Sequence, residues 1–334
     1  MKIGVIGAGS WGTTLANLLA KKKGFSVTLW AYEADLVARM AASHENDLFL
    51  PGVQLDANLS FSNDLAEVAA DRDLLLLVPP SQVMRKVMTV AAPHLNPRTL
   101  VVSASKGVEN DTLAPMSTVL TDVLPESFHE RLAFLSGPSF AREVAKEMPT
   151  AVVAAAEDLT VAAEVQDVFS TDYFRVYTND DIIGVELGGA LKNVIAVAAG
   201  VSDGLGFGYN TRAALITRGL AEITRLGLAM GAKPATFAGL AGMGDLVLTC
   251  TGDLSRNRTV GVELGKGRSL DDILGGMKMV AEGVKTTLSA FQLASKLGVD
   301  VPITEQMYQI LYQNKDPRQA VSDLMLRELK AEGI

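Results

Sequence analysis

The chain has 334 residues, of which 48% are hydrophobic and 20% are charged, and its formal net charge is −8. This length exceeds the usual size of one hydrophobic core, so we expect two domains, and the apolar content excludes a disordered chain. The negative charge and the scattered basic residues argue against nucleic acid or an anionic membrane as a partner.

In the first half of the chain, short β-branched or leucine-rich runs alternate with longer helical patterns. This alternation is typical of a mainly parallel sheet covered by helices, so we predict an N-terminal Rossmann-type, doubly wound α/β domain. The runs that we predict as its strands are Ile3 to Ile6, Val27 to Trp30, Leu74 to Val78, Leu100 to Ser103, Leu132 to Leu135, Ala151 to Ala155 and Phe174 to Tyr177.

The pattern changes near Asp181, because the apolar residues beyond it recur at helical spacing. We therefore predict a dinucleotide-binding Rossmann domain over residues 1–179 and an all-helical (all-α) substrate and catalytic domain over residues 180–334. The glycine-rich run from Gly200 to Gly208 is expected to be a flexible connection that could border the active site. The clearest helical segments are Arg212 to Met230, Thr286 to Leu297 and Gln319 to Ala331.

The first predicted strand leads into a run that fits the dinucleotide-binding pattern G-x-G-x-x-G, Gly7-Ala8-Gly9-Ser10-Trp11-Gly12. The pattern alone is weak, but here it follows a strand and opens a helix, as the mechanism requires. Gly7 permits the tight turn, Gly9 lets the backbone approach a pyrophosphate, and Gly12 allows close helix packing. The amides of Ser10 and Trp11 are expected to contact the phosphates at the positive end of the helix dipole. The alternatives are a turn without a ligand and a nucleotide site without redox chemistry.

The sequence leaves the choice between NAD and NADP open. After the second predicted strand the chain reads Ala31-Tyr32-Glu33, so the acidic residue comes later than the one that usually binds the ribose hydroxyls of NAD. The next arginine, Arg39, lies well along the following helix, which is a poor position for binding a 2′-phosphate.

Polar residues follow two further predicted strands. Lys106 comes just after the strand that ends at Ser103, and Gly137 and Ser139 follow the next strand. Ligands of open α/β sheets bind at this carboxyl edge. Lys106 could instead be an ordinary surface lysine. Ser139 could cap the helix that follows it, which would not prevent it from contacting a ligand.

Lys192 lies in a segment, Ile182 to Val201, that is otherwise mostly apolar. An ammonium group there needs a partner or a water-filled cleft. Partial burial would lower its pKa toward the range useful for a general acid or base, and Asn193 adds a neutral hydrogen-bonding group. The alternative is a lysine whose long side chain reaches the surface.

The helical half also contains a carboxylate and a basic cluster. Asp245 ends a glycine-rich turn, and Ser255 is predicted to cap a helix that begins with Arg256, Asn257 and Arg258. A forked guanidinium, an amide and the free N–H groups of a helix terminus together suit a phosphate. An ordinary capped helix is the alternative.

Cysteine and histidine are scarce in the chain. Cys250 is its one cysteine, and its three histidines, His44, His94 and His129, lie far apart. We therefore expect a reducing compartment and no structural metal. The start of the chain lacks the features of a signal peptide, and its most apolar later run is too short to span a bilayer. We expect a cytoplasmic protein without stable membrane insertion.

Taken together, these motifs resemble the NAD(P)-dependent glycerol-3-phosphate dehydrogenases of the bacterial soluble type over almost the whole chain. In chain order they are GAGSWG, SKG, SGPSFA, LKN, GMGDL and SRNR. The resemblance implies an oxidoreductase that reversibly reduces dihydroxyacetone phosphate to sn-glycerol 3-phosphate with NAD(P)H, for glycerophospholipid synthesis. Its implied partner is a small phosphorylated triose, and a homodimer is reasonable for the apolar helical half.

The resemblance also implies roles for individual residues. Lys192 is the implied proton acceptor, Lys106 would stabilise charge, and Asp245 would orient either Lys192 or a substrate hydroxyl. The implied substrate-binding residues are Lys106, Gly137, Ser139, Lys192, Asp245, Ser255, Arg256 and Asn257. The implied cofactor contacts, beside the three fingerprint glycines, are Ser10, Trp11, Tyr32, Lys106, Ala141, Arg256, Val280 and Glu282.

One departure from the family pattern bears on the choice between NAD and NADP. The family often carries basic residues where this chain has Ala31 and Tyr32, which argues against a strong preference for NADP, although Lys21 to Lys23 could partly compensate.

The nearest rival function is another dehydrogenase of the β-hydroxyacid type. A non-catalytic module that senses nicotinamide is a second rival, against which Lys192 and the SRNR cluster argue, because a sensor needs neither.

Overall fold

The computed structural model describes residues 1–276, 281–329 and 331–332, and the chain divides into two compact units. The first unit contains Met1–Lys106 and Ala114–Ile182, and the second contains Gly107–Leu113 and Ile183–Ile334. The short segment 107–113 therefore belongs with the helical half, where Val108 joins the apolar core. Because this excursion is only seven residues long, no change of pattern marks it in the sequence.

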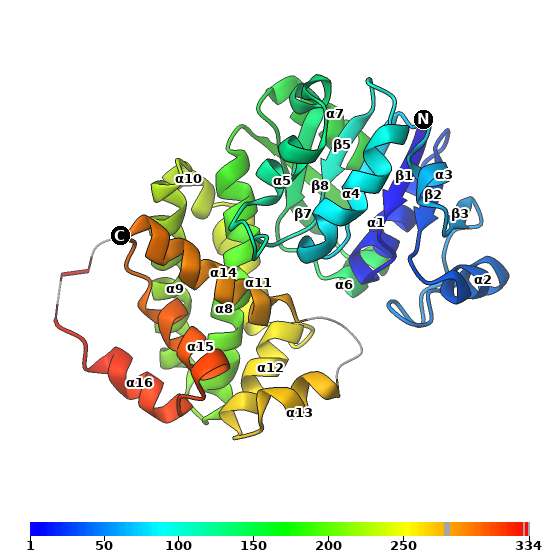
Figure 1. Ribbon diagram of the computed structural model, residues 1–334. Helices are drawn as coiled ribbons and strands as arrows, with labels where there is room; N and C mark the ends of the chain where they lie inside the picture. Colours follow the sequence, from blue (N-terminus) through cyan, green and yellow to red (C-terminus); the bar gives the residue numbers. More distant parts are fainter. Residues whose placement is uncertain (277–280, 330, 333–334) are drawn as a thin grey trace. The chain divides into compact units, whose positions relative to one another are not determined.

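The first unit is built on an eight-stranded sheet (Figure 1). Its strands lie in the order β3-β2-β1-β4-β5-β6-β7-β8, and all neighbours are parallel except β6 and β7. The order reverses between β1 and β4, which makes the carboxyl ends of these strands the expected ligand edge. The strands are β1 Lys2–Ile6, β2 Ser26–Trp30, β3 Leu59–Ser62, β4 Leu74–Leu77, β5 Leu100–Ser103, β6 Leu132–Ser136, β7 Thr150–Ala155 and β8 Phe174–Asn179.

Helices cover both faces of this sheet, as the alternating pattern predicts. On β4, Leu74 and Leu76 join one core while Leu75 and Leu77 join the other, so all four leucines are buried. A strand that is buried on both faces reads as one continuous apolar run. The first core packs against α1 Ser10–Ala20, α2 Ala34–Ser43 and α7 Leu159–Phe169, and the second against α3 Leu65–Ala69, α4 Met84–Ala91 and α5 Met116–Val123. A short helix, α6 Ala141–Ala145, follows β6.

The sequence did not predict β3. This strand lies at the edge of the sheet, pairs only with β2, and buries just Leu59 and Ser62 of its four residues. A short edge strand has too few buried positions to produce a visible apolar pattern.

The described residues of the second unit from Ile183 on are helical, with turns and loops between the helices. The longest helix, α8, is long and apolar enough to cross a membrane, but 89% of its most apolar window is buried inside the protein, as expected for a core helix. The helices are α8 Ile182–Gly204, α9 Tyr209–Ala229, α10 Pro234–Phe237, α11 Asp245–Thr251, α12 Arg256–Gly265, α13 Leu270–Gly275, α14 Glu282–Leu297, α15 Pro302–Gln313 and α16 Pro317–Met325, with a π-helical turn over Leu240–Gly244.

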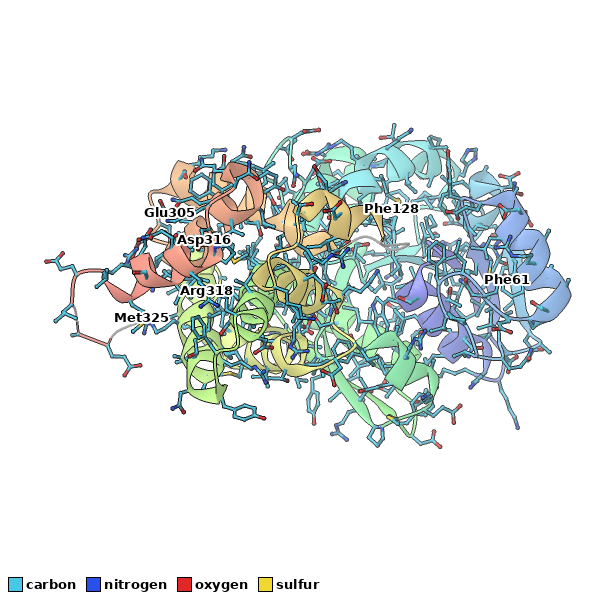
Figure 2. All side chains as sticks on the ribbon, turned by 90° about the horizontal axis from the view of Figure 1, so that it is seen from below. Phe61, Phe128, Glu305, Asp316, Arg318 and Met325 are labelled. Carbon is cyan, nitrogen blue, oxygen red and sulfur yellow. The ribbon has the colours of Figure 1, made fainter. Side chains whose placement is uncertain are left out.

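The last helix is shorter than predicted. Asp316 caps α16 by accepting from the backbone N–H groups of Arg318 and Gln319, and the helix ends at Met325 instead of continuing to Ala331 (Figure 2). Met325 and Leu326 are exposed, so burial of their apolar side chains does not stabilise a further helical turn. Most helices in proteins are stabilised by burying their apolar face. The apolar residues of this last segment are not buried, so their helical spacing does not produce a longer helix.

The glycines at the end of α8 allow close helix packing. The prediction of a flexible connection over residues 200–208 is wrong for residues 200–204, because they belong to α8. A Cβ on Gly200 would lie 2.1 Å from the Arg258 carbonyl oxygen, and one on Gly261 would lie 2.0 Å from that of Val197. Gly204 is similarly close to α12. Small residues one helical turn apart therefore let the backbones of α8 and α12 touch (Figure 1). This contact holds the start of α12 against the helix that carries Lys192.

Candidate functional site

The turn between β1 and α1 requires two of its glycines for internal reasons. Gly7 has φ +114°, and a Cβ there would lie 2.7 Å from the carbonyl group of Val78. A Cβ on Gly12 would lie 1.9 Å from the carbonyl oxygen of Gly7. The tight turn and the close approach of α1 therefore depend on glycine at both positions, as the sequence predicts.

Gly9 differs from these two glycines, because no atom of the other residues that the structure describes lies within 4 Å of the Cβ that a larger residue would have. Its backbone, with φ −63° and ψ 174°, is open to any residue. The protein's own packing thus gives no reason for a glycine here, whereas close approach of an outside group to the backbone does. The turn therefore fits a pyrophosphate.

The start of α1 is also electrostatically suited to an anion. Its N-cap residue, Gly9, supplies no side-chain acceptor, and its first turn contains no acidic residue. The N–H groups of Ser10, Trp11 and Gly12 have no acceptor within the helix, and the positive end of the helix dipole lies there. Trp11 itself is half-buried, with its ring 6.4 Å from that of Phe174.

The residues that directly follow β2, Ala31, Tyr32 and Glu33, include no basic group for a 2′-phosphate. Tyr32 is 82% exposed and lies edge-on to Trp30, while Arg39 pairs with Asp35 and Asp47. Lys21 to Lys23 follow the last turn of the 11-residue helix α1, about 16 Å from its N-terminus, which argues against the compensation suggested for them. Lys21 pairs there with Glu147 at 2.6 Å.

Residues from two strand ends meet at the carbonyl oxygen of Gly137. Lys106 Nζ and Ser139 Oγ each donate a hydrogen bond to it at 3.0 Å. Gly137 has φ +131°, and a Cβ there would lie 3.0 Å from Val152 Cα. The predicted capping role of Ser139 is wrong, since Phe140 precedes α6 as N-cap and makes no side-chain cap.

The same segment also reaches the dinucleotide turn. Thr14 Oγ1, in the first turns of α1, donates to the backbone carbonyl of Ala141 at 3.2 Å. This contact brings the start of α6 beside the start of α1. The GAGSWG and SGPSFA motifs, which are far apart in the sequence, therefore meet at one edge of the sheet.

In the second unit, Lys192 has the partner that its position demands. Its side chain is buried, with 7% of the residue exposed, and its Nζ forms an ion pair with Oδ1 of Asp245, which is 1% exposed. The alternative of a lysine that reaches the surface is therefore wrong. Burial disfavours both charges, but each stabilises the charge on the other.

Local structure fixes the backbone at Asp245. Asp245 opens α11 directly after the π-helical turn, and Thr249 Oγ1 donates to its carbonyl oxygen at 2.6 Å. A Cβ on Gly188 of α8 would lie 2.5 Å from the Ala241 carbonyl oxygen, so this turn packs closely against the helix of Lys192. π-Helical turns are often found at functional sites.

Cys250 lies in the same environment without being a nucleophile. Burial raises the pKa of its thiol to about 12, an effect that the nearby Lys192 ammonium opposes and the Asp245 carboxylate reinforces. The protonated thiol is a weak nucleophile, so Cys250 is not a candidate nucleophile beside the ion pair of Lys192 and Asp245.

Ser255 caps α12 as predicted, since its Oγ accepts from the backbone N–H of Arg258 at 3.3 Å. The Arg256 side chain remains accessible to solvent, although burial lowers the pKa of its guanidinium and the neighbouring Glu282 carboxylate opposes that shift. An accessible guanidinium that is partly desolvated by its surroundings is well placed to bind an anion.

Asn257 joins three of the predicted segments. Its Nδ2 donates to Oδ1 of Asn193 at 2.8 Å, and its Oδ1 accepts from the backbone N–H of Gly283 at 2.9 Å. The LKN motif, the SRNR motif and the start of α14, where Glu282 lies, therefore share one hydrogen-bond network. Val280, a predicted cofactor contact, lies outside the described residues.

Arg258 has a different environment from Arg256. Its guanidinium pairs with Asp203 at 2.8 Å and with Asp253 at 3.1 Å, and Asp203 also binds Arg212 at 2.6 Å. Its charge is thus neutralised by side chains of the protein. Asp203 was not predicted from the sequence. Its acidic side chain near the end of an otherwise mostly apolar helix was the feature that could have revealed it.

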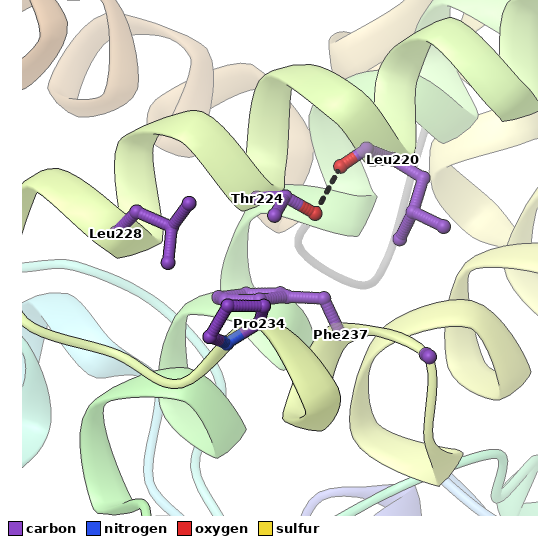
Figure 3. A pocket seen from close by; sticks show the side chains of 6 residues that line it. Leu220, Thr224, Leu228, Pro234 and Phe237 are labelled. Carbon is purple, nitrogen blue, oxygen red and sulfur yellow. Dashed lines mark hydrogen bonds between the residues drawn. The ribbon is translucent and has the colours of Figure 1, made fainter. Parts of the chain in front are cut away.

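A cavity of about 330 Å³ lies elsewhere in the second unit, between α9 and α10 (Figure 3). The one hydroxyl among its lining side chains, that of Thr224, donates to the carbonyl oxygen of Leu220. Its walls carry no charge that could bind a phosphate, and none of the predicted site residues lines it. The lining residues are Leu220, Thr224, Leu228, Pro234, Phe237 and Ala238.

Comparison with known proteins gives matches over nearly the whole chain. Residues 2–162 match the model of the NAD-dependent glycerol-3-phosphate dehydrogenase N-terminus, and residues 181–322 match that of its C-terminus. The glycerol-3-phosphate dehydrogenase [NAD(P)+] of Syntrophotalea carbinolica is 68% identical, covering 99% of both chains. That of Geobacter metallireducens is 69% identical, covering 99% of this chain and 98% of its own.

A solved structure is also similar. The crystal structure of glycerol-3-phosphate dehydrogenase from Coxiella burnetii superposes with a TM-score of 0.93 at 40% identity. The superposition covers 98% of this chain and 99% of the Coxiella burnetii chain. The Rossmann-type domain followed by an all-helical one, as expected from the sequence, is thus also the fold of this relative.

Proposed function

Because the chain belongs to the NAD-dependent glycerol-3-phosphate dehydrogenase family, we propose that it interconverts dihydroxyacetone phosphate and sn-glycerol 3-phosphate with NAD(P)H. It is an oxidoreductase, and its product in the reducing direction supplies the backbone of glycerophospholipids. The observation that supports this activity best is the buried ion pair of Lys192 and Asp245, near which Asn193 links to the helix that carries Arg256.

Residues 1–179 are the proposed dinucleotide-binding domain. The amides at the start of α1 bind the pyrophosphate, and Gly9 leaves room for it to approach. When bound, the nicotinamide supplies or accepts the hydride at C2 of the triose. The further proposed cofactor contacts are Ser10, Trp11, Tyr32, Lys106, Ala141, Arg256, Val280 and Glu282.

Residues 180–334 are the proposed substrate and catalytic domain, in which Lys192 moves the proton. In reduction its ammonium donates a proton to the oxygen on C2, and the resulting amine regains one from solvent. In oxidation the neutral amine accepts the hydroxyl proton. Asp245 holds the ammonium in position through the ion pair, and Thr249 Oγ1 donates to the backbone carbonyl oxygen of Asp245.

The substrate phosphate is proposed to bind at the start of α12. Arg256 provides a forked donor, and the helix terminus capped by Ser255 provides backbone N–H groups. Asn257 keeps this terminus in place relative to Asn193, and one of its amide hydrogens is already used in that bond. Lys106, Gly137 and Ser139 are the proposed substrate contacts of the first domain, with Lys106 stabilising charge on the reacting oxygen.

A substrate screen tests this function directly. Purified protein should consume NADH or NADPH when dihydroxyacetone phosphate is added, as followed by the nicotinamide absorbance. The keto forms of β-hydroxy acids should give no more than background turnover. Faster turnover of such an acid would favour the rival dehydrogenase, and dinucleotide binding without turnover of any substrate would favour the sensor.

The paired state of Arg39 and the position of Lys21 to Lys23 support an enzyme without a strong preference for NADP. Comparing kcat/KM for NADH and NADPH measures this preference. We also propose a cytoplasmic location and a homodimer, for which light scattering in solution should give the mass of two chains.

A further inference from the structure

Asn46 is a fully buried polar residue beside the dinucleotide turn, with 0% of its surface exposed. Its Nδ2 donates to the carbonyl oxygen of Ala8 at 2.8 Å and to Thr13 Oγ1 at 2.8 Å. Its Oδ1 accepts from the backbone N–H of Phe49 at 2.9 Å. The side chain therefore uses both ends of its amide, and Ala8 is the residue between the first two glycines of the fingerprint.

A closed loop, residues 44–55, presents Asn46 to this turn. The backbone N–H of Leu55 donates to the carbonyl of His44 at 2.7 Å, and Glu45 and Gln54 form an antiparallel bridge. The Leu50 side chain is fully buried and its N–H donates to the Asn46 carbonyl oxygen at 2.9 Å. Asn46 is thus fixed by its own loop and is not merely filling space.

The contact with Ala8 determines where the next amide points. In a trans peptide the C=O of one residue and the N–H of the following residue point in opposite directions. The Ala8 carbonyl is directed inward by Asn46 and, at 3.2 Å, by Thr13 Oγ1. The N–H of Gly9 must then point away from these side chains, on the residue whose missing Cβ leaves open space.

We propose that Asn46 is a positioning residue for dinucleotide binding, which fixes the Ala8–Gly9 peptide so that the Gly9 amide faces the pyrophosphate. This inference rests on the proposed function, because it needs a dinucleotide at the turn. Asn46 acts through the peptide and does not touch the reacting atoms. Without it, the peptide can rotate and the amide loses its fixed direction.

The test is calorimetric binding of ADP-ribose, which carries the adenosine and the pyrophosphate but no nicotinamide. Asn46→Ala should weaken ADP-ribose binding about tenfold or more, the effect of losing one oriented hydrogen bond to a charged group. At saturating dinucleotide, kcat should change by less than about twofold, since the chemistry is elsewhere.

Asn17→Ala is the matched control. Asn17 is also a buried asparagine, its Oδ1 accepts from the backbone N–H of Asp56 at 2.7 Å just beyond the same loop, and no bond joins it to Ala8. Its variant should lose stability without losing ADP-ribose affinity. Equal weakening by the two variants would show that Asn46 only stabilises the fold and would overturn the proposal.

Asn46→Asp is a second variant, which keeps the shape of the side chain if Asn46→Ala fails to fold. Its ionised carboxylate cannot donate to Ala8, whereas its protonated form can, so ADP-ribose affinity should recover as the pH is lowered from about 8 to 5. A pH profile identical to that of the wild type would contradict the proposal. Failure of the wild type to bind ADP-ribose would instead overturn the proposed function.

Discussion

The dinucleotide turn and the Lys192 site use different parts of the polypeptide. The turn consists of backbone amides from one contiguous run, and it depends on the lack of a side chain at Gly7, Gly9 and Gly12. The Lys192 site consists of side chains, and Lys192 and Asp245 are 53 positions apart. The turn is therefore sensitive to added bulk, whereas the Lys192 site is sensitive to lost charge.

The helix N-termini show the same contrast on a smaller scale. Ser255 caps α12 with its own hydroxyl, and the buried Glu222 of α9 binds the first N–H groups of α15 through Ile303 and Thr304. The start of α1 has no such acceptor from its cap residue. The start of α15 is thus satisfied by the protein itself, whereas Ser255 satisfies only one N–H group at the start of α12 and the cap residue of α1 satisfies none, so these two termini are suited to an outside anion.

The largest expected effect comes from removing the proton donor. Lys192→Ala should lower kcat by about 10² to 10⁴-fold while ADP-ribose binding stays unchanged, because the two sites use separate groups. Stopped-flow absorbance measures the hydride-transfer rate, and calorimetry measures the binding. Near-normal hydride transfer in this variant would remove Lys192 from the mechanism.

Two glycine substitutions separate folding from binding at the turn. Gly12→Ala should destabilise the protein by about 3 kcal/mol or more, because its Cβ would overlap the Gly7 carbonyl oxygen at 1.9 Å. Gly9→Ala should leave the free energy of unfolding nearly unchanged but weaken ADP-ribose binding. Denaturant titration and calorimetry on both variants check this. If Gly9→Ala binds as well as the wild type, no ligand approaches there.

Arg256→Ala should raise the KM for dihydroxyacetone phosphate about 10- to 100-fold, with a smaller change in kcat, because it removes a charge-assisted contact to phosphate. Steady-state kinetics at saturating NADH measure both constants. Arg256→Lys serves as the control, since it keeps the charge and loses the fork. An unchanged KM would place the phosphate elsewhere.

Glu222 gives the smallest effect, and it lies outside both sites. Burial raises the pKa of its carboxyl from 4.5 to about 7, although the N–H groups of Ile303 and Thr304 oppose this. The folded state thus holds a proton that the unfolded state releases, so this stabilisation is complete below about pH 4.5 and is lost as the pH rises through about 7.

Urea unfolding at pH 5 and pH 8 tests this prediction. The wild type should lose about 2–3 kcal/mol from this group over that range, and Glu222→Gln should not show that loss. Activity at constant pH should be nearly the same in both proteins if the variant is folded. An equal pH slope in the two proteins would mean that Glu222 is ionised throughout.

Local sequence was sufficient to predict features that depend on neighbouring residues. The roles of Gly7 and Gly12, the Ser255 cap and the two-faced sheet follow from turn geometry, capping and periodicity, which act over a few residues. For the same reason Lys192 was visible as a lone charge in an apolar helix.

Only the tertiary structure decided which distant residues pair with one another. It showed that Asp245 pairs with Lys192, which was one of two roles that the resemblance implied, joined Asn257 to Asn193, showed Gly200 and Gly204 to be packing residues, and brought Asn46 to the Ala8 carbonyl. The edge strand β3 and the uncapped start of α6 also emerged only there. These features depend on how helices and loops far apart in the chain pack together, and sequence spacing contains no information on that packing.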